Sequence, residues 1–432
     1  MGPTFANEPL TDRLESAFPK LARSGPHLVM EAAPFLRWVH VEAMAAPKWS
    51  RDLPLSVPEG LMQAAESEVV SADALAIVNT SGATAAPKAV VHTHGSLVRH
   101  AALIASRRGL TPDDRIYSPM PFFWVGGLTM VLITALVSGA GAVIQQRFEP
   151  GEALDLIERE KVTQIACWPT ASRQLAEHPT FSRRDLSAVR GGTLTEVLPL
   201  KYRPPTPDRA PVALGMTETG GPHTGPDNDY QVLPESLSRT FGRSLPGMEH
   251  TIVSLDTGSK LPVGEEGELV LRGAFLMEGL YKRERHDTFT PDGWYKTGDL
   301  GWFGSDGHLR FTGRRTGMIK TAGSNVSPAE VEVALLGLPE VRSAIVFGIP
   351  AGDRGEDVAA VVVPELSDLP AMLDLRSALR AQLASYKIPR HLKVMAEGDI
   401  PVLATGKPDL VALRDLFRNQ ADGEVAGSVS TN

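Results

Sequence analysis

The stretch at residues 292–332 concentrates side chains that could hold a polyanion. It reads DGWYKTGDLGWFGSDGHLRFTGRRTGMIKTAGSNVSPAEVE and combines Gly, Asp, Arg and Lys in short strand-like pieces. Glycines let a backbone approach a ligand closely, and guanidinium groups pair well with phosphate oxygens. This composition is typical of a ligand-binding surface, and it indicates a site for a phosphorylated molecule.

A second candidate is the loop NTSGATAAPK at 79–88, which follows the strand-like residues 73–79. Small residues expose backbone N–H groups, hydroxyls add donors and Lys88 adds a positive charge, so the loop suits phosphate. It is not the phosphate loop of P-loop kinases and ATPases, because Pro87 and Ala89 stand where that motif requires Gly and Ser or Thr.

Two more segments complete a series of four along the chain. They are LGMTE at 214–218 and PVLATGK at 401–407. In this order, the four segments resemble the motifs of the adenylate-forming superfamily, which includes acyl-CoA synthetases, luciferases and nonribosomal-peptide adenylation domains. The sequence departs from the family pattern at Ala83, Ala85 and Leu214, where the family has Thr, Gly and an aromatic residue.

The resemblance implies a role for each matching residue. The ATP phosphates would be held by Thr80, Ser81, Gly82, Thr84 and Lys88, the nucleotide would be contacted by Gly215 and Met216, and the α-phosphate by Thr217. Glu218 would bind Mg²⁺, and the ribose would be held by Asp299 and Arg314. Lys407 would act at the reacting centre, and the CoA thiol would lie beside Lys320 and Gly323.

The segment MPFFWVGG at 120–127 resembles the start of the family's acid pocket. Phe123 and Trp124 would form an apolar wall, and Gly126 and Gly127 would leave room for a chain, which favours a fatty or aryl acid. Ordinary core packing is the alternative. The nearby His92 and His94 lack a third ligand, so we expect a structural role for them rather than a zinc site.

The activity implied by the resemblance is an ATP- and Mg²⁺-dependent acid–CoA ligase. The enzyme would activate a small carboxylic acid as acyl-AMP and pass the acyl group to coenzyme A. Two alternatives stay open: a ligase that loads an acyl carrier protein, and a catalytically silent homologue that only binds a nucleotide or acyl ligand.

The order of the predicted elements indicates an α/β fold. Strand-like and helix-like segments alternate from 73 to 169, with helices over 93–107 and 152–160, which predicts helix-covered, mostly parallel sheets. Short β pieces between 240 and 312 indicate a small β subdomain, and a small α+β domain follows.

The resemblance implies an N-terminal AMP-binding domain over 1–314, a mobile C-terminal lid over 317–418 and a disordered tail over 419–432. The family places more sequence before the phosphate loop than the 79 residues here, so the first domain is expected to lack part of its start. Exposed apolar sheet edges or a compensating homodimer would be consequences.

Composition narrows the remaining classes. The chain has 432 residues, 42% of them hydrophobic and 22% charged, and a net charge of −8, which argues against a nucleic-acid partner. The single Cys167 and the lack of an opening signal peptide favour the cytoplasm. Residues 125–144 carry no charge, but their glycines predict a buried helix, a turn and a buried strand instead of a membrane span.

Overall fold

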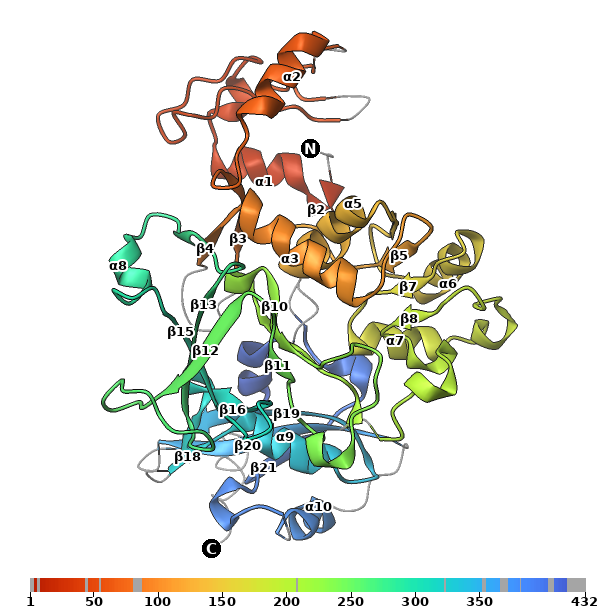
Figure 1. Cartoon of the computed structure of the whole chain (residues 1–432), viewed down its shortest axis with the longest axis vertical. Helices are drawn as coiled ribbons and strands as arrows, with labels where there is room; N and C mark the ends of the chain where they lie inside the picture. The colour runs from red at the N-terminus through yellow and green to blue at the C-terminus, as the bar shows by residue number, and fades with distance from the viewer. Residues whose placement is uncertain are drawn as a thin grey trace, which may run out of the picture.

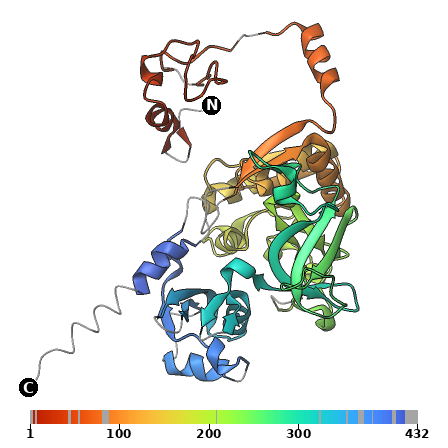
Figure 2. The ribbon, with the colours of Figure 1, turned by 90° about the vertical axis from the view of Figure 1, so that its left-hand side faces the viewer.

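The computed structural model describes residues 4–5, 8–42, 46–53, 56–80, 88–206, 209–321, 324–351, 355–365, 372–380, 382–402 and 408–417. Figure 1 shows the N-terminal segment at one end of the molecule, a large mixed body in the middle and a smaller domain at the other end. Figure 2 shows the helix α2 (Glu59–Glu68) leading from the N-terminal segment to the body. The large and small domains correspond to the predicted α/β fold class.

A parallel sheet forms one side of the body. Its strand order is β6 (Gly141–Ile144), β5 (Arg115–Ser118), β7 (Gln164–Ile165) and β8 (Gly191–Gly192). Helices α6 (Pro150–Arg159) and α7 (Pro169–Ala176) pack on it through Leu154, Ile157 and Leu175. In the described part of the chain, parallel pairing within the body is confined to this sheet, because its helical crossovers are the connections that parallel strands need.

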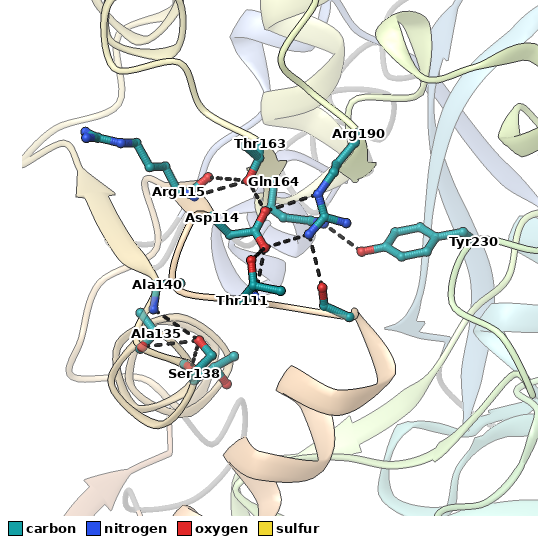
Figure 3. A network of polar contacts seen from close by, with 12 residues as sticks. Thr111, Asp114, Arg115, Ala135, Ser138, Ala140, Thr163, Gln164, Arg190 and Tyr230 are labelled. Carbon is teal, nitrogen blue, oxygen red and sulfur yellow. Dashed lines mark hydrogen bonds and ion pairs between the residues drawn. The ribbon is translucent and has the colours of Figure 1, made fainter.

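A buried carboxylate joins the loops of this sheet. Asp114, 3% exposed, accepts hydrogen bonds from the Arg190 guanidinium at 3.1 and 2.6 Å and from the Thr163 hydroxyl at 2.6 Å (Figure 3). Thr111 also donates to it from its backbone N–H and its hydroxyl. Burial alone would raise the pKa of Asp114, but these hydrogen bonds outweigh burial and lower the pKa.

Replacing this carboxylate should cost stability. Asp114→Asn keeps the shape but loses an acceptor for Arg190 or Thr163, so we expect the free energy of unfolding to fall by about 2–3 kcal/mol in urea denaturation. Asp227→Asn is the matched control, because its pair with Arg243 is exposed and should change stability by less than about 0.5 kcal/mol. Equal changes in the two variants would contradict this role for Asp114.

The predicted phosphate loop joins two antiparallel strands, β3 (Ala74–Asn79) and β4 (Ala89–Thr93), and α3 (His94–Arg107) follows directly. The predicted strand and helix are thus confirmed, with β4 as an additional element between them. The order of the sheet is β14–β4–β3, with β14 at Gly279–Leu280. At its β3 edge, Leu75 and Ile77 are 37% and 50% exposed.

The uncharged segment 125–144 folds as a broken helix and a strand. It comprises α4 (Val125–Gly127), the π-helical η2 (Leu128–Ile133), α5 (Thr134–Ser138) and β6. Gly139, at φ 73°, ends the helix in the left-handed conformation. The prediction of a buried strand is wrong, because β6 lies at the sheet edge and Ile144 is 54% exposed. Among the described residues, no helix combines the length and apolar character needed to cross a bilayer.

Antiparallel strands form the predicted β subdomain. The larger sheet is β12 (Met248–Val253), β13 (Gly267–Gly273), β15 (Tyr295–Phe303) and β16 (Leu309–Arg314), and the smaller is β11 (Arg243–Ser244), β10 (Gly221–Gly225) and β9 (Leu214–Met216). The smaller sheet lies between the larger one and α3 (Figure 1).

The C-terminal domain starts after the short helix η9 (Arg315–Gly317). Its elements are β17 (Ile319–Thr321), β18 (Ser324–Val326), α9 (Pro328–Leu336), β19 (Val341–Pro350), β20 (Glu356–Pro364), α10 (Met372–Leu379) and β21 (His391–Val394). Strand β20 pairs antiparallel with β19 and parallel with β21, and α9 packs over this sheet through Val331 and Leu335.

Candidate functional site

The turn that carries Glu218 is the best-anchored part of the site. It is the 3-10 helix η7 (Thr217–Thr219), which ends at Gly220 in the left-handed conformation at φ 66°. Glu218 is 9% exposed, and its Oε1 accepts a hydrogen bond of 2.9 Å from the hydroxyl of Tyr295 on β15. Burial raises the pKa of Tyr295, so this hydroxyl stays protonated and donates.

The chemistry of this carboxylate fits Mg²⁺ that is shared with a substrate. In the described residues, no three His, Cys, Asp or Glu side chains gather as a metal site, and Glu218 is the hard oxygen ligand that the resemblance implies. Mg²⁺ is commonly bound by one or two carboxylates together with substrate phosphates and water. A phosphorylated substrate would therefore have to supply the remaining ligands.

Asp299 lies on the same strand as Tyr295 and pairs with Arg314 on β16. The Arg314 Nε lies 2.8 Å from the Asp299 Oδ1, with the side chains 61% and 2% exposed. Burial, the larger effect, raises the pKa of Asp299, and the charge of Arg314 offsets it only in part. The Thr297 hydroxyl accepts from the Asp299 N–H at 2.9 Å, which fixes the backbone of the predicted ribose-binding group.

Thr80 and Lys88 close the base of the predicted phosphate loop. The Thr80 N–H donates to the Lys88 carbonyl at 2.9 Å, and the Lys88 N–H donates to the Thr80 hydroxyl at 3.3 Å. The Lys88 side chain is exposed, as a phosphate ligand requires. Ser81, Gly82 and Thr84 lie outside the described residues.

Three aromatic side chains, Phe123, Trp124 and Trp168, lie together at the predicted acid pocket. The Trp124 ring lies 5.7 Å from Phe123 and 6.1 Å from Trp168, which the sequence did not single out. Phe123, with Phe122 and Leu128, also lines a cavity of about 310 Å³ beside residues 76–79. Trp124, Gly126 and Gly127 are not part of that lining.

The two glycines of this segment have different surroundings. A Cβ on Gly127 would lie 2.2 Å from the Pro121 carbonyl oxygen, and one on Gly126 would lie 3.0 Å from the sulfur of Met120. At Gly127 the backbone therefore leaves no space for a side chain, whereas at Gly126 the only neighbour is the flexible end of the Met120 side chain, and the role of both glycines in an acid pocket stays a prediction.

The other predicted residues lie partly next to the Glu218 turn and partly in the C-terminal domain. Gly215 and Met216 end β9 directly before Thr217, so they reach the site through the backbone. Lys320 lies on β17 in the C-terminal domain, where its N–H donates to Glu356 at 2.9 Å. Lys407 and Gly323 lie outside the described residues, as does the tail 419–432.

Tyr295 and Glu268, like Trp168, were not predicted from the sequence. Glu268, 4% exposed, accepts from the Gly298 N–H at 3.1 Å and faces Arg315 at 3.6 Å, so it supports the turn before Asp299. The one signal for Tyr295 was its place four residues before Asp299, which puts both side chains on one strand. Nothing in the sequence placed Glu268 against this strand.

Two histidines pair beneath the turn. His223 on β10 is fully buried, and its Nδ1 lies 3.0 Å from the Nε2 of His250, whose Nδ1 contacts the Ser244 hydroxyl at 2.7 Å. Burial lowers the pKa of His223 to about 3 and that of His250 to about 4. Both rings are therefore neutral at pH 7.

This pair should make stability depend on pH. Below the usual pKa of about 6.5 the unfolded chain takes up protons that the folded His223 cannot, so stability should fall as the pH drops from 6.5 towards 4. His223 alone would contribute up to about 2 kcal/mol between pH 6.5 and pH 5. Urea unfolding at pH 7.0 and 5.0 measures this loss, and His223→Gln should reduce it. An unchanged loss in that variant would contradict the assignment.

Comparisons with known proteins identify the family of the chain. The family model described as "AMP-binding enzyme" matches residues 4–281, and the model "AMP-binding enzyme C-terminal domain" matches residues 330–407. The chain belongs to the AMP-binding enzyme family. The predicted membership of the adenylate-forming superfamily is thereby confirmed.

Named relatives within the AMP-binding enzymes act on different acids. A feruloyl-CoA synthase of Amycolatopsis is 31% identical over 85% of this chain and 75% of its own length. An indoleacetate–CoA ligase of Aromatoleum aromaticum is 32% identical over 77% of this chain and 65% of its own length. The chain spans only 62% of a third relative, YngI of Bacillus subtilis, at 33% identity.

Solved structures of AMP-binding enzymes share the fold. The amide bond synthetase McbA of Marinactinospora thermotolerans superposes with a TM-score of 0.70 at 30% identity, covering 88% of this chain and 75% of McbA. The o-succinylbenzoate CoA synthetase MenE of Bacillus subtilis, solved with its acyl-adenylate intermediate, gives 0.63 at 28% identity over 78% of this chain and 68% of MenE.

Proposed function

We propose that the protein is an ATP- and Mg²⁺-dependent acid–CoA ligase. The observation that carries this proposal is the hydrogen bond between Tyr295 and Glu218. It links Glu218, the proposed metal ligand, to strand β15, which also bears Asp299. The family membership and the names of the CoA-ligase relatives support the same activity. The aromatic group at Phe123, Trp124 and Trp168 favours a fatty or aryl acid.

The first step is adenylation. A carboxylate oxygen of the acid attacks the α-phosphorus of ATP, the bond to the bridging oxygen of the β-phosphate breaks, and pyrophosphate leaves. When bound, Mg²⁺ neutralises phosphate charge, and Glu218 holds it. Asp299 and Arg314 orient the ribose, and Thr80, Ser81, Gly82, Thr84 and Lys88 hold the phosphates. Lys407 stabilises charge at the reacting centre, and Thr217 contacts the α-phosphate.

The second step is thioester formation. The CoA sulfur attacks the acyl carbon and AMP departs as the leaving group. The thiol proton passes to solvent or to the phosphate group of the released AMP. Lys320 and Gly323 lie beside the thiol in this proposal, which requires the C-terminal domain, 317–418, to move relative to residues 1–314. Splitting one hard condensation into two steps is the advantage of the acyl-AMP intermediate.

Pyrophosphate release tests the first step. A panel of short, medium, long-chain and aryl acids with Mg·ATP should give acid-dependent release, and Glu218→Gln should lower the rate at least about 100-fold because the metal ligand is lost. Lys407→Ala should act similarly, whereas Glu235→Gln, an exposed acid, should not. Normal release by Glu218→Gln would contradict its role. No release from the folded protein with any acid would favour the silent binding homologue.

The acceptor can be identified in the same assay. Coenzyme A should complete the turnover and give an acyl thioester, whereas a phosphopantetheinylated carrier protein should not replace it. An amine belongs in the comparison, because McbA is named as an amide bond synthetase. Turnover with the carrier or the amine alone would contradict CoA as the acceptor while leaving adenylation intact.

An ion-pair cluster joins the two domains in the present arrangement. Arg342 on β19 contacts Glu177, which directly follows α7, and lies 3.4 Å from Glu397. Glu397 in turn lies 3.6 Å from Arg173 on α7. The hydrogen bond with Glu177 raises the pKa of Arg342, so its charge is retained.

Loss of this cluster should loosen the lid. Since a partly exposed network is worth about 1 kcal/mol, Arg342→Gln should speed tryptic cleavage at residues 314–320 by about fivefold. High salt should have the same effect on the wild type and little effect on the variant. Arg183→Gln, an exposed arginine near α7, is the control. Equal cleavage rates for the two variants would contradict the interdomain role.

A further inference from the structure

Two buried histidines form hydrogen bonds with the carbonyl groups of Thr217 and Thr219, the residues on either side of Glu218. The Nε2 of His92 lies 2.7 Å from the Thr217 carbonyl oxygen, and the Nδ1 of His100 lies 3.1 Å from the Thr219 carbonyl oxygen. Both side chains are 0% exposed. A carbonyl oxygen can only accept, so each of these ring nitrogens is the donor, which fixes the tautomer of each histidine.

Within the described part of the chain, no other side chain from a different element donates to the backbone of this turn. The Glu218 carbonyl accepts from the Met277 N–H at 2.8 Å, and its carboxylate accepts from Tyr295. The remaining bonds of the turn come from the turn itself, such as the Thr219 hydroxyl to the Met216 carbonyl at 3.2 Å. The histidines therefore set where the Glu218 Cα lies relative to β4 and α3.

We propose that His92 and His100 are positioning residues that place the Glu218 carboxylate for a divalent cation bound together with a nucleotide. This inference rests on the proposed function and extends it, since neither residue would touch the cation or the substrate. For His92 it gives a specific form to the structural role that was expected of His92 and His94.

Strand β4 gives the arrangement a second consequence. It starts one residue after Lys88 and carries His92 four residues beyond that lysine, so one short strand connects the base of the phosphate loop to the carboxylate turn. A strand is a stiff spacer of about 3.3 Å per residue. The cation ligand and the phosphate-binding lysine are thereby held at a fixed separation.

The His100 ring is itself held in place by its neighbours. The His100 ring stacks on Phe275 with a centroid distance of 4.5 Å and an angle of 7°. On the turn side, a Cβ on Gly221 would lie 3.0 Å from the His100 Cε1, so the turn is packed directly against the ring. A side chain of similar volume but without a donor at the right atom could fill the space without holding the carbonyl.

Amide substitutions separate positioning from simple packing. The amide nitrogen of Gln reaches the place of a histidine Nε2, and that of Asn reaches the place of Nδ1. His92→Gln and His100→Asn should therefore retain the hydrogen bond, whereas His92→Asn and His100→Gln should lose it. All four are polar amides in the same buried space, and thermal melting followed by circular dichroism identifies the folded variants.

The measurement is Mn²⁺ binding followed by electron paramagnetic resonance, with α,β-methylene-ATP as the nucleotide. We expect His92→Asn and His100→Gln to weaken Mn²⁺ binding about 10- to 100-fold, as loss of a residue that orients a metal ligand does. His92→Gln and His100→Asn should stay within about threefold of the wild type. His223→Gln, at a neighbouring buried histidine, should lower stability and leave Mn²⁺ binding unchanged.

Each outcome decides the proposal. Opposite preferences at the two positions, Gln at 92 and Asn at 100, would support it, and one folded pair is sufficient for the comparison. Equal Mn²⁺ affinity for both amides at a position, or a loss that only follows the melting temperature, would overturn it. Failure of the wild type to bind Mn²⁺ with the nucleotide would overturn the proposed function and this inference with it.

Discussion

The hydrogen bond between Tyr295 and Glu218 is the contact on which the arrangement of the site depends. It joins a turn after β9 to the central strand β15, two segments 77 residues apart in the chain. Both side chains are buried, so water does not compete for this bond and its loss would leave a buried carboxylate without its donor. Asp299 lies on the same strand, and the positions of the two carboxylates are therefore linked.

Charge is distributed unevenly around this strand. Glu218, Asp299 and Glu268 are all buried, whereas the arginines that pair with Asp299 and Glu268, Arg314 and Arg315, are more than half exposed. The interior of the site is consequently acidic. It suits hydroxyl donors and a cation, while phosphate groups need the separate basic loop that Lys88 closes.

Motifs with their own chemistry could be predicted from the sequence, and contacts between distant segments could not. The strand before the phosphate loop, helix α3 and the change to short β pieces were all predicted from local pattern. Strand β4 was missed because only five residues separate the loop from α3. The apolar run at 125–144 suggested burial for β6, but this strand lies at the edge of its sheet, and Ile144 is 54% exposed.

The site shows the same limit. Glu218 and Asp299 stand in motifs, whereas Tyr295, Glu268 and the two histidines act through hydrogen bonds to residues between 30 and 125 positions away. No local pattern encodes such distances. His92 was singled out for its spacing from His94, but only His92 contacts the Glu218 turn, because His94 is the first residue of α3.

Arg314 is the last residue of β16 and directly precedes the short helix η9, at Arg315–Gly317, that leads into the small domain. In any rotation about η9, displacement grows with distance from the axis. Groups at the far side of the small domain would sweep through a long arc, whereas Arg314 would hardly shift. In the proposed mechanism, a bound ribose would therefore keep its contact with the Arg314 guanidinium while the small domain rotates.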